Sequence, residues 1–412
     1  MSASFGASVS DAAGPAAPIP RGAVLALSLA AFLSGISLRL TDALLPLFAH
    51  EFGITLGRAA GAITAFAVAY GLSQLFFGPV GDRFGKYRVI GLACATCTLT
   101  ASACGVTEGF VQLEIARLMA GATAAAIIPL SMAWLGDVVP YEQRQPVLAR
   151  FLIGQILGLS AGVAAGGFAA DHLGWRVPFF VIGAGFAVIS VALLAIDRRL
   201  PAHARRTNRV AGHALQRAVG EFGQVLARPW ARVVLLTVFT EGAFLYGSFA
   251  FIASHLHTRF GLPLSSAGST LMLFGFGGLL FAVAAAALVR RLGEVGLTMY
   301  GGMLVAASLV AIGVAPHWAW APPACFTAGL GFYMLHNTLQ INATQMAPER
   351  RGAAVAAFAS SFFLGQAAGV AANGLLVESI GTGGVLCLGA TGVLALALNF
   401  SRLRSQRIAM PA

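Results

Sequence analysis

Long apolar stretches recur along nearly the whole chain, and short polar runs separate them. A helix needs about 20 predominantly apolar residues to cross the hydrocarbon core of a bilayer. Twelve stretches meet this length: residues 22–48, 57–78, 89–106, 109–134, 146–170, 177–196, 231–254, 264–289, 297–316, 321–345, 353–378 and 382–401. The pattern predicts an all-α polytopic membrane protein with twelve transmembrane helices.

The polar segments divide this array into two equal sets of helices. The longest one, 197–230, separates six predicted helices from six, and in it Leu215, Val219, Phe222 and Leu226 repeat at helical spacing. We therefore expect an amphipathic helix in a linker. The predicted parts are a disordered leader 1–21, a first bundle 22–196, the linker 197–230, a second bundle 231–402 and a tail 403–412.

The composition agrees with a membrane protein, and the distribution of charge predicts the orientation of its helices in the membrane. The chain is 58% hydrophobic and 10% charged, so it has more apolar surface than a soluble domain can bury. Most of the 26 Lys and Arg residues behind the net charge of +11 lie near the N-terminus, in alternate loops and near the C-terminus. This positive-inside bias predicts that both termini face the cytoplasm. Basicity thus reports topology, and we expect no nucleic-acid partner.

Motifs for catalysis and for cofactors are missing from the sequence. It has no Gly-x-x-x-x-Gly-Lys-Ser/Thr loop for phosphate and no histidine pair with zinc spacing. Cys94 and Cys97 share a helix face, but they lie in an apolar segment without a nearby histidine, so we interpret them as packing residues. We expect no enzyme activity, no cofactor and no metal. Any active transport would then draw on an ion gradient.

Four charges interrupt the apolar segments and are the first candidates for function. Arg39 and Asp42 lie in the first segment, and Glu114 and Arg117 lie in the fourth. A charge at the bilayer centre is costly and usually faces a cavity or a partner. Asp42 and Arg117 lie at similar depth, roughly 9 Å from the outer end of their helices, so they can meet. Making and breaking that pair would change the protonation of Asp42.

A structural explanation of these charges stands beside the functional one. Arg39 and Asp42 are three residues apart, as are Glu114 and Arg117, so each pair could close on its own helix. Such pairs would only make membrane insertion tolerable. Glu241, near the middle of the seventh segment, has two interpretations as well: a protonated packing residue, or a site for a proton or a cationic substrate.

Polar residues in two further segments are candidates for a cavity wall. One face of the tenth segment carries Tyr333, His336, Asn337 and Gln340. Tyr70 and Gln74, four residues apart in the second segment, could face the same space. The alternative is hydrogen bonding between packed helices. His336 is the histidine placed to titrate in such a cavity.

Glycine-rich patterns predict close packing and a gate. Gly154, Gly158, Gly162 and Gly166 form a stripe that would let a neighbouring backbone approach the fifth segment. The loop after the second segment contains Gly78, Gly81, Asp82, Arg83, Gly85, Lys86 and Arg88. Its glycines permit tight turns, and Asp82 could bind an arginine or a helix N-terminus and latch the cytoplasmic side.

Short sequence patterns of the first half repeat in the second, and several motifs resemble those of a known family. Gly154-Gln155 with Gly158 returns as Gly365-Gln366 with Gly369, which indicates duplicated halves. The resemblance rests on the 78–88 loop, on Asp42 with Pro46, on Arg117 with Gly121 and on Trp175–Phe180. It also rests on the glycines around Val163, although the family's motif has proline at the position of Val163. The chain resembles the major facilitator superfamily, nearest its bacterial drug:proton antiporter branch.

This resemblance implies a fold and a function. It implies two pseudo-symmetric six-helix bundles around a cavity, alternating access, a monomer in the bacterial inner membrane, and roles in proton coupling for Asp42 and Arg117. We expect a secondary active transporter whose partners are lipid, protons and a small molecule, with proton-coupled export of a drug or metabolite. The alternatives are a proton-coupled importer, symporter or facilitator of a small organic anion, which Arg39 and Arg117 could bind, and, remotely, a receptor or scaffold without transport.

Overall fold

The computed structural model describes residues 20–205 and 214–409, and every regular element in these ranges is helical. Parts of the predicted leader, linker and tail (1–19, 206–213 and 410–412) lie outside the described residues. The first half contains α1 (Arg21–Arg39), η1 (Leu40–Ala43), α2 (Leu45–Glu51), α3 (Leu56–Ala59), α4 (Gly61–Phe84), α5 (Lys86–Gly105), α6 (Phe110–Ala124), α7 (Ile127–Val138), α8 (Tyr141–His172) and α9 (Arg176–Asp197).

The rest of the described chain begins with the short η2 (Ala202–Arg205) and contains two very long helices. Its other elements are α10 (Ala214–Ala227), α11 (Pro229–Glu241), the π-helix η3 (Gly242–Tyr246), α12 (Gly247–Phe249), α13 (Ile252–Phe260), α14 (Leu264–Val314), η4 (Trp318–Trp320), α15 (Ala321–Gln345), η5 (Pro348–Arg350) and α16 (Arg351–Ala409). The helix α10 lies in the predicted linker.

Nine helical runs in the described ranges are long and apolar enough to cross a membrane. The two longest, α14 and α16, each contain one glycine with a non-helical backbone, Gly293 (φ 61°, ψ −179°) and Gly381 (φ 71°, ψ 166°). Positive φ is a conformation that glycine adopts at little cost. Both glycines fall between segments that the sequence predicts as separate helices. The prediction of an all-α membrane fold is confirmed, while the exact number of twelve helices stays a prediction.

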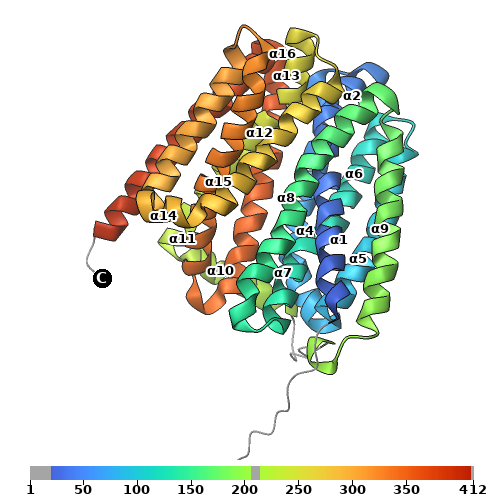
Figure 1. Ribbon diagram of the computed structural model, residues 1–412, viewed down its shortest axis with the longest axis vertical. Helices are drawn as coiled ribbons and strands as arrows, with labels where there is room; N and C mark the ends of the chain where they lie inside the picture. Colours follow the sequence, from blue (N-terminus) through green and yellow to red (C-terminus); the bar gives the residue numbers. More distant parts are fainter. Residues whose placement is uncertain (1–19, 206–213, 410–412) are drawn as a thin grey trace, which may run out of the picture.

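Buried apolar side chains form two large clusters that follow the two halves of the chain. One consists mostly of residues 23–204, and the other mostly of residues 225–400. In Figure 1 the helices of the first half, coloured blue to green, lie on the right, and those of the second half, coloured yellow to red, lie on the left. The two clusters place an interface between the halves along the long axis of the molecule.

Glycines allow close helix contacts within each half. The glycines of α8 face carbonyl oxygens of α1 and η1: Gly154, Gly158, Gly162 and Gly166 lie against Ser28, Phe32, Ile36 and Leu40. In the second half, Gly365 and Gly369 of α16 lie in the same way against the carbonyl oxygens of Phe239 and Ala243. A Cβ atom at any of these positions would collide with backbone, so the halves repeat one packing device.

One end of the molecule is closed by hydrogen bonds that cross between the halves. Asp171, at the end of α8, accepts hydrogen bonds from the backbone N–H groups of Leu264 (3.2 Å) and Ser265 (2.8 Å), which begin α14. Glu378 of α16 accepts one from the N–H of Gly57 in α3 (3.2 Å). Each carboxylate thus caps the first turn of a helix in the opposite half, where negative charge is favourable. We call these two contacts the cross-half caps.

Candidate central cavity

A cavity of about 2450 Å³ lies between the halves and is lined by residues of both. Its wall reaches Asp82 and Arg83 at the end of α4 and Arg351 at the start of α16. Close by, the Tyr87 hydroxyl donates a hydrogen bond to the carbonyl oxygen of Ala23 (3.2 Å), near the start of α1. The cavity therefore extends to the end of the bundle where α1 begins, opposite the cross-half caps.

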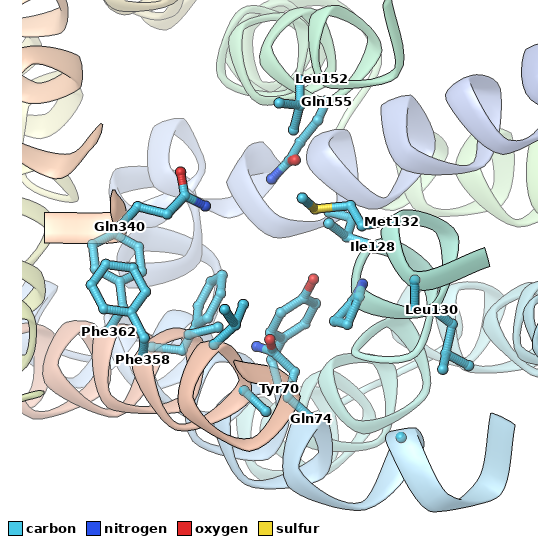
Figure 2. Close-up of a pocket in the computed structure, with 18 of the residues that line it drawn as sticks. Tyr70, Gln74, Ile128, Leu130, Met132, Leu152, Gln155, Gln340, Phe358 and Phe362 are labelled. Carbon is cyan, nitrogen blue, oxygen red and sulfur yellow. The ribbon is translucent and has the colours of Figure 1, made fainter. Parts of the chain in front are cut away.

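Amides and aromatic rings face one another across this space (Figure 2). Gln74 and Gln155 line it from the first half, and Gln340, Phe358 and Phe362 line it from the second. Amide side chains can donate and accept hydrogen bonds, whereas the rings offer apolar area. A wall with much apolar area and a few placed polar groups is typical of sites for small molecules.

The first half contributes a buried ion pair at a break in its first helix. Asp42 is fully buried in η1, and its Oδ2 accepts a hydrogen bond from Nη1 of Arg39 at 3.1 Å. Its Oδ1 has no hydrogen-bond partner in the described part of the chain. The helix breaks here because Pro46 lacks the N–H that would bond to the Asp42 carbonyl, with which its ring clashes. Arg39 also lines the cavity.

Arg117 lies next to this pair without joining it. Its Nη1 donates to the carbonyl oxygen of Ser37 (2.9 Å) and its Nη2 to Oγ1 of Thr41 (3.4 Å). The guanidinium also covers the ring of Phe66, 4.2 Å from the centroid. The prediction that Asp42 and Arg117 lie near one another therefore holds, but the partner of Asp42 in this conformation is Arg39. The expected Asp42–Arg117 ion pair is corrected, and the alternative prediction, in which Arg39 and Asp42 close on one another, is the arrangement that the structure has.

The second half contributes a pair that the sequence did not connect. Oε2 of the fully buried Glu241 lies 2.8 Å from Nδ1 of His336, and its Oε1 has no hydrogen-bond partner among the described residues. The His336 side chain is 18% exposed and lines the cavity. Its ring contacts Phe332 and Phe362 at centroid distances of 4.9 and 4.8 Å. A titratable imidazole thus stands between the carboxylate and the cavity.

Comparisons with known proteins identify the family. The sequence profile of the Major Facilitator Superfamily matches residues 27–370. The chain belongs to this superfamily. It is 24% identical over 352 residues to the uncharacterized MFS-type transporter YceJ of Bacillus subtilis, covering 84% of this chain and 87% of YceJ. It is 30% identical over 184 residues to the multidrug export protein EmrB of Haemophilus influenzae, covering 43% of this chain but 36% of EmrB.

A solved structure agrees with the fold of this Major Facilitator Superfamily transporter. The crystal structure of a mutant of the peptide transporter POT aligns with a TM-score of 0.78 at 15% identity. The alignment covers 95% of this chain and 96% of the other. At this identity the likeness concerns the fold alone. The predicted resemblance to the superfamily is confirmed.

One predicted site residue of the transporter lies away from the cavity. Glu114 does not line it, and its carboxylate pairs with the guanidinium of Arg58, which also covers the Phe110 ring. The placement of Glu114 in the cavity, and its alternative pairing with Arg117, are both corrected. The partner comes from α3, 56 positions earlier in the chain, and helix spacing could not indicate it.

The loop motif of the superfamily lies at the mouth of the cavity. Gly85 has φ 90°, which lets the chain turn between α4 and α5. Lys86 lies between two carboxylates, 3.1 Å from Asp82 and 2.5 Å from Asp137. Gly81 packs against Leu130. Gly78 and Arg83 line the cavity, and Arg88 is exposed. In this conformation Asp82 is thus bound within its own motif.

The other predicted cavity residues of the transporter do line the cavity: Tyr70, Gln74, Tyr333, His336, Asn337 and Gln340. Two features of the cavity were not predicted from the sequence. One is Tyr246, which lines the deep part of the cavity and contacts Arg39, and the other is the aromatic wall formed by Phe358 and Phe362. A signal existed for the wall, because two phenylalanines four positions apart share a helix face. Tyr246 follows Glu241 by five positions and lies in a π-helix, which the sequence pattern did not indicate.

Proposed function

We propose that this protein is a secondary active transporter that moves a small amphipathic molecule by alternating access, with export driven by proton entry. The observation that carries this proposal is a cavity between the halves, open at one end and closed at the other, with one buried carboxylate on each side of it. Export as the direction is supported by the resemblance to the drug:proton antiporter branch and by the similarity to EmrB.

The topology proposed from the charge bias assigns one end of the bundle to the cytoplasmic side of the membrane and the other end to the outer side. With both termini in the cytoplasm of a bacterial cell, the mouth near Asp82 and Arg351 opens inward, and the cross-half caps lie on the outer side. The structure then represents the inward-open state. Opening outward requires the cross-half caps to break and the mouth to close, which is the exchange that alternating access demands.

We assign the transported proton to the Glu241–His336 pair. A carboxylate and an imidazole 2.8 Å apart can share a proton, and the imidazole gives that proton a route to the cavity. Asp42 has a different partner, since the arginine that binds it is permanently charged. We propose that Asp42 stays ionised while it holds Arg39, and that its role in proton coupling runs through this pair and the neighbouring Arg117.

A vesicle experiment tests coupling and direction together. Purified protein is reconstituted with a trapped pH-sensitive dye, and metabolites, dyes and antibiotics found by a thermal-shift screen are added outside. Antiport predicts that substrate entry drives protons out of the vesicle. Proton movement with the substrate would contradict antiport and indicate symport, and saturable substrate flux without proton movement would indicate a facilitator. Absence of any saturable flux would favour a receptor or scaffold.

One observation favours a second function, proton-coupled symport of an organic anion. In the deep part of the cavity the basic side chains in the lining are Arg39 and His336, while the carboxylates of Asp42 and Glu241 are fully buried behind them. A negatively charged group would meet a cationic surface there. The same vesicle experiment, run with an aromatic carboxylate, its amide and its amine, separates this candidate from export of a neutral or cationic molecule.

A further inference from the structure

Tyr246 connects the two halves at the deep end of the cavity. The guanidinium carbon of Arg39, in the first half, lies 3.8 Å from the centroid of the Tyr246 ring, in the second. Tyr246 is 4% exposed and Arg39 is 3% exposed, so water competes little for this contact. A cation over the face of an aromatic ring is attracted to it, and more strongly when both are desolvated. Arg39 is therefore held from two sides, by Asp42 and by Tyr246.

The backbone ties Tyr246 to Glu241. Tyr246 is the last residue of the π-helix η3, which begins directly after Glu241. A π-helix inserts an extra residue into the helical turn and is frequent at functional sites. Because this turn sets the direction of the Tyr246 side chain relative to Glu241, a change in the turn moves both groups.

The rings of Phe332 and Phe362 connect Tyr246 to His336. The Tyr246 ring meets Phe332 and Phe362 edge to face, each at a centroid distance of 5.4 Å. The His336 imidazole contacts these two rings at 4.9 and 4.8 Å. Packed side chains respond to displacement of a neighbour because interiors contain few voids. A movement of His336 therefore has two routes to Tyr246. One passes through the two phenylalanine rings, and the other passes through Glu241 and along the π-helix.

We propose that Tyr246 is the positioning residue that ties the Glu241–His336 pair of the second half to the Arg39–Asp42 pair of the first. The inference rests on the proposed proton coupling and deepens it. When the Glu241–His336 pair gains or loses its proton, Tyr246 moves, and Arg39 loses or regains the nearer of its two aromatic contacts, Tyr246 at 3.8 Å against Phe249 at 5.4 Å. Outward opening separates the halves at this end, so the Arg39–Tyr246 contact belongs to the state seen here.

The ionisable surroundings of Tyr246 come from several helices. They are Arg39 of α1 and Asp42 of η1 on one side, Glu241 of α11 and His336 and Tyr333 of α15 on the other, and Arg117 of α6 beyond Asp42. A pH-dependent change of conformation can start at any of them. A test must therefore compare variants of Tyr246 with a neighbour in the same aromatic cluster that lacks the contact with arginine.

The experiment follows the closed end as pH changes. Spin labels are placed through Glu108→Cys, in a loop of the first half, and Trp318→Cys, at the start of η4 in the second half, two exposed positions at that end. Cys387 is replaced by alanine, since the other four cysteines are buried. Pulsed electron resonance in lipid nanodiscs then measures the distance between the labels from pH 5 to pH 9. No substrate is needed, because the readout is the population of the two states.

Three variants decide the role of Tyr246. Tyr246→Phe keeps the ring face and should keep the wild-type pH midpoint. Tyr246→Leu removes the ring and should shift the midpoint by about one pH unit or abolish the response. Phe274→Leu, which removes a ring that touches Tyr246 (6.2 Å between centroids), is the matched control and should leave the midpoint in place.

The possible outcomes separate the inference from the proposal beneath it. A wild-type protein whose states do not respond to pH would overturn proton coupling and the inference with it. A wild-type response that Tyr246→Leu leaves unchanged would overturn the role of Tyr246 alone. Equal shifts in Tyr246→Leu and Phe274→Leu would also overturn it, because they would assign the effect to general packing of the cluster.

Discussion

Asp42 in the first half and Glu241 in the second occupy comparable places in their halves. Both are fully buried, and each has one oxygen bound by a basic side chain that lines the cavity while its other oxygen has no partner in the described residues. The bases differ in chemistry, because a guanidinium stays charged in proteins whereas an imidazole exists in a neutral and a protonated form. The comparison teaches that the base beside Asp42 is a guanidinium, whereas the base beside Glu241 is an imidazole that can hold or release a proton.

The largest effect is expected from Asp42→Asn, which breaks the Arg39–Asp42 pair. It leaves Arg39 buried without its carboxylate, so the free energy of unfolding should fall by about 3 kcal/mol. Proton-driven transport should be lost while the protein still inserts into the membrane. Denaturation in detergent and the vesicle assay measure the two effects, with Asp42→Glu as the control that retains the charge. If Asp42→Asn left the stability or the proton coupling unchanged, the role assigned to the Arg39–Asp42 pair would be contradicted.

Glu241→Gln should abolish coupling with a much smaller effect on stability. The amide can still hydrogen-bond to His336, which can stay neutral, so the free energy of unfolding should change by less than about 1 kcal/mol. The pH response of the spin-labelled protein should vanish. If Glu241→Gln destabilised the protein as much as Asp42→Asn, both pairs would behave as ion pairs and the comparison would fail.

The cross-half caps extend the comparison to the closed end. Asp171 accepts hydrogen bonds from two backbone N–H groups and from the Ser265 hydroxyl (2.6 Å), whereas Glu378 accepts one from Gly57. Asp171→Ala should therefore favour the outward-open state by about 2 kcal/mol, and Glu378→Ala by about 0.5 kcal/mol. Distances between spin labels in the two variants provide the measurement, and an equal or reversed order would argue against the caps as the closing contacts.

The smallest effect is expected from Glu114→Gln. This carboxylate pairs with Arg58, whose side chain is 46% exposed, so the pair should contribute no more than about 1 kcal/mol to stability. Transport and its pH dependence should match the wild type. A loss of coupling in Glu114→Gln would show that proton traffic involves more than the two deep pairs.

The sequence predicted the fold well because membrane insertion and helix packing leave local patterns. Apolar length predicted the helices, and the spacing of the glycines from Gly154 to Gly166 matched the carbonyl oxygens that they meet in α1 and η1. Depth along the helices also placed Arg117 beside η1, where it reaches Thr41. These features depend on residues within one helix or on distance along the membrane normal.

The partners in the site could not be predicted, because they depend on how distant helices rotate against each other. Glu241 and His336 are 95 positions apart, and nothing in either helix indicates the other. For Asp42 the spacing left two partners open, Arg39 on the same helix and Arg117 on another, and the structure shows Arg39. Tyr246, which contacts Arg39, is the last residue of a π-helix, an irregularity that regular helical spacing does not predict.

Infrared difference spectroscopy tests the central claim, that the proton resides on the Glu241–His336 pair and not on Asp42. Spectra of the protein in nanodiscs at high and low pH would show the C=O stretch of a protonated carboxyl group. We predict that this band titrates in the wild type, survives in Asp42→Asn and disappears in Glu241→Gln. A band that disappears in Asp42→Asn and persists in Glu241→Gln would contradict the account.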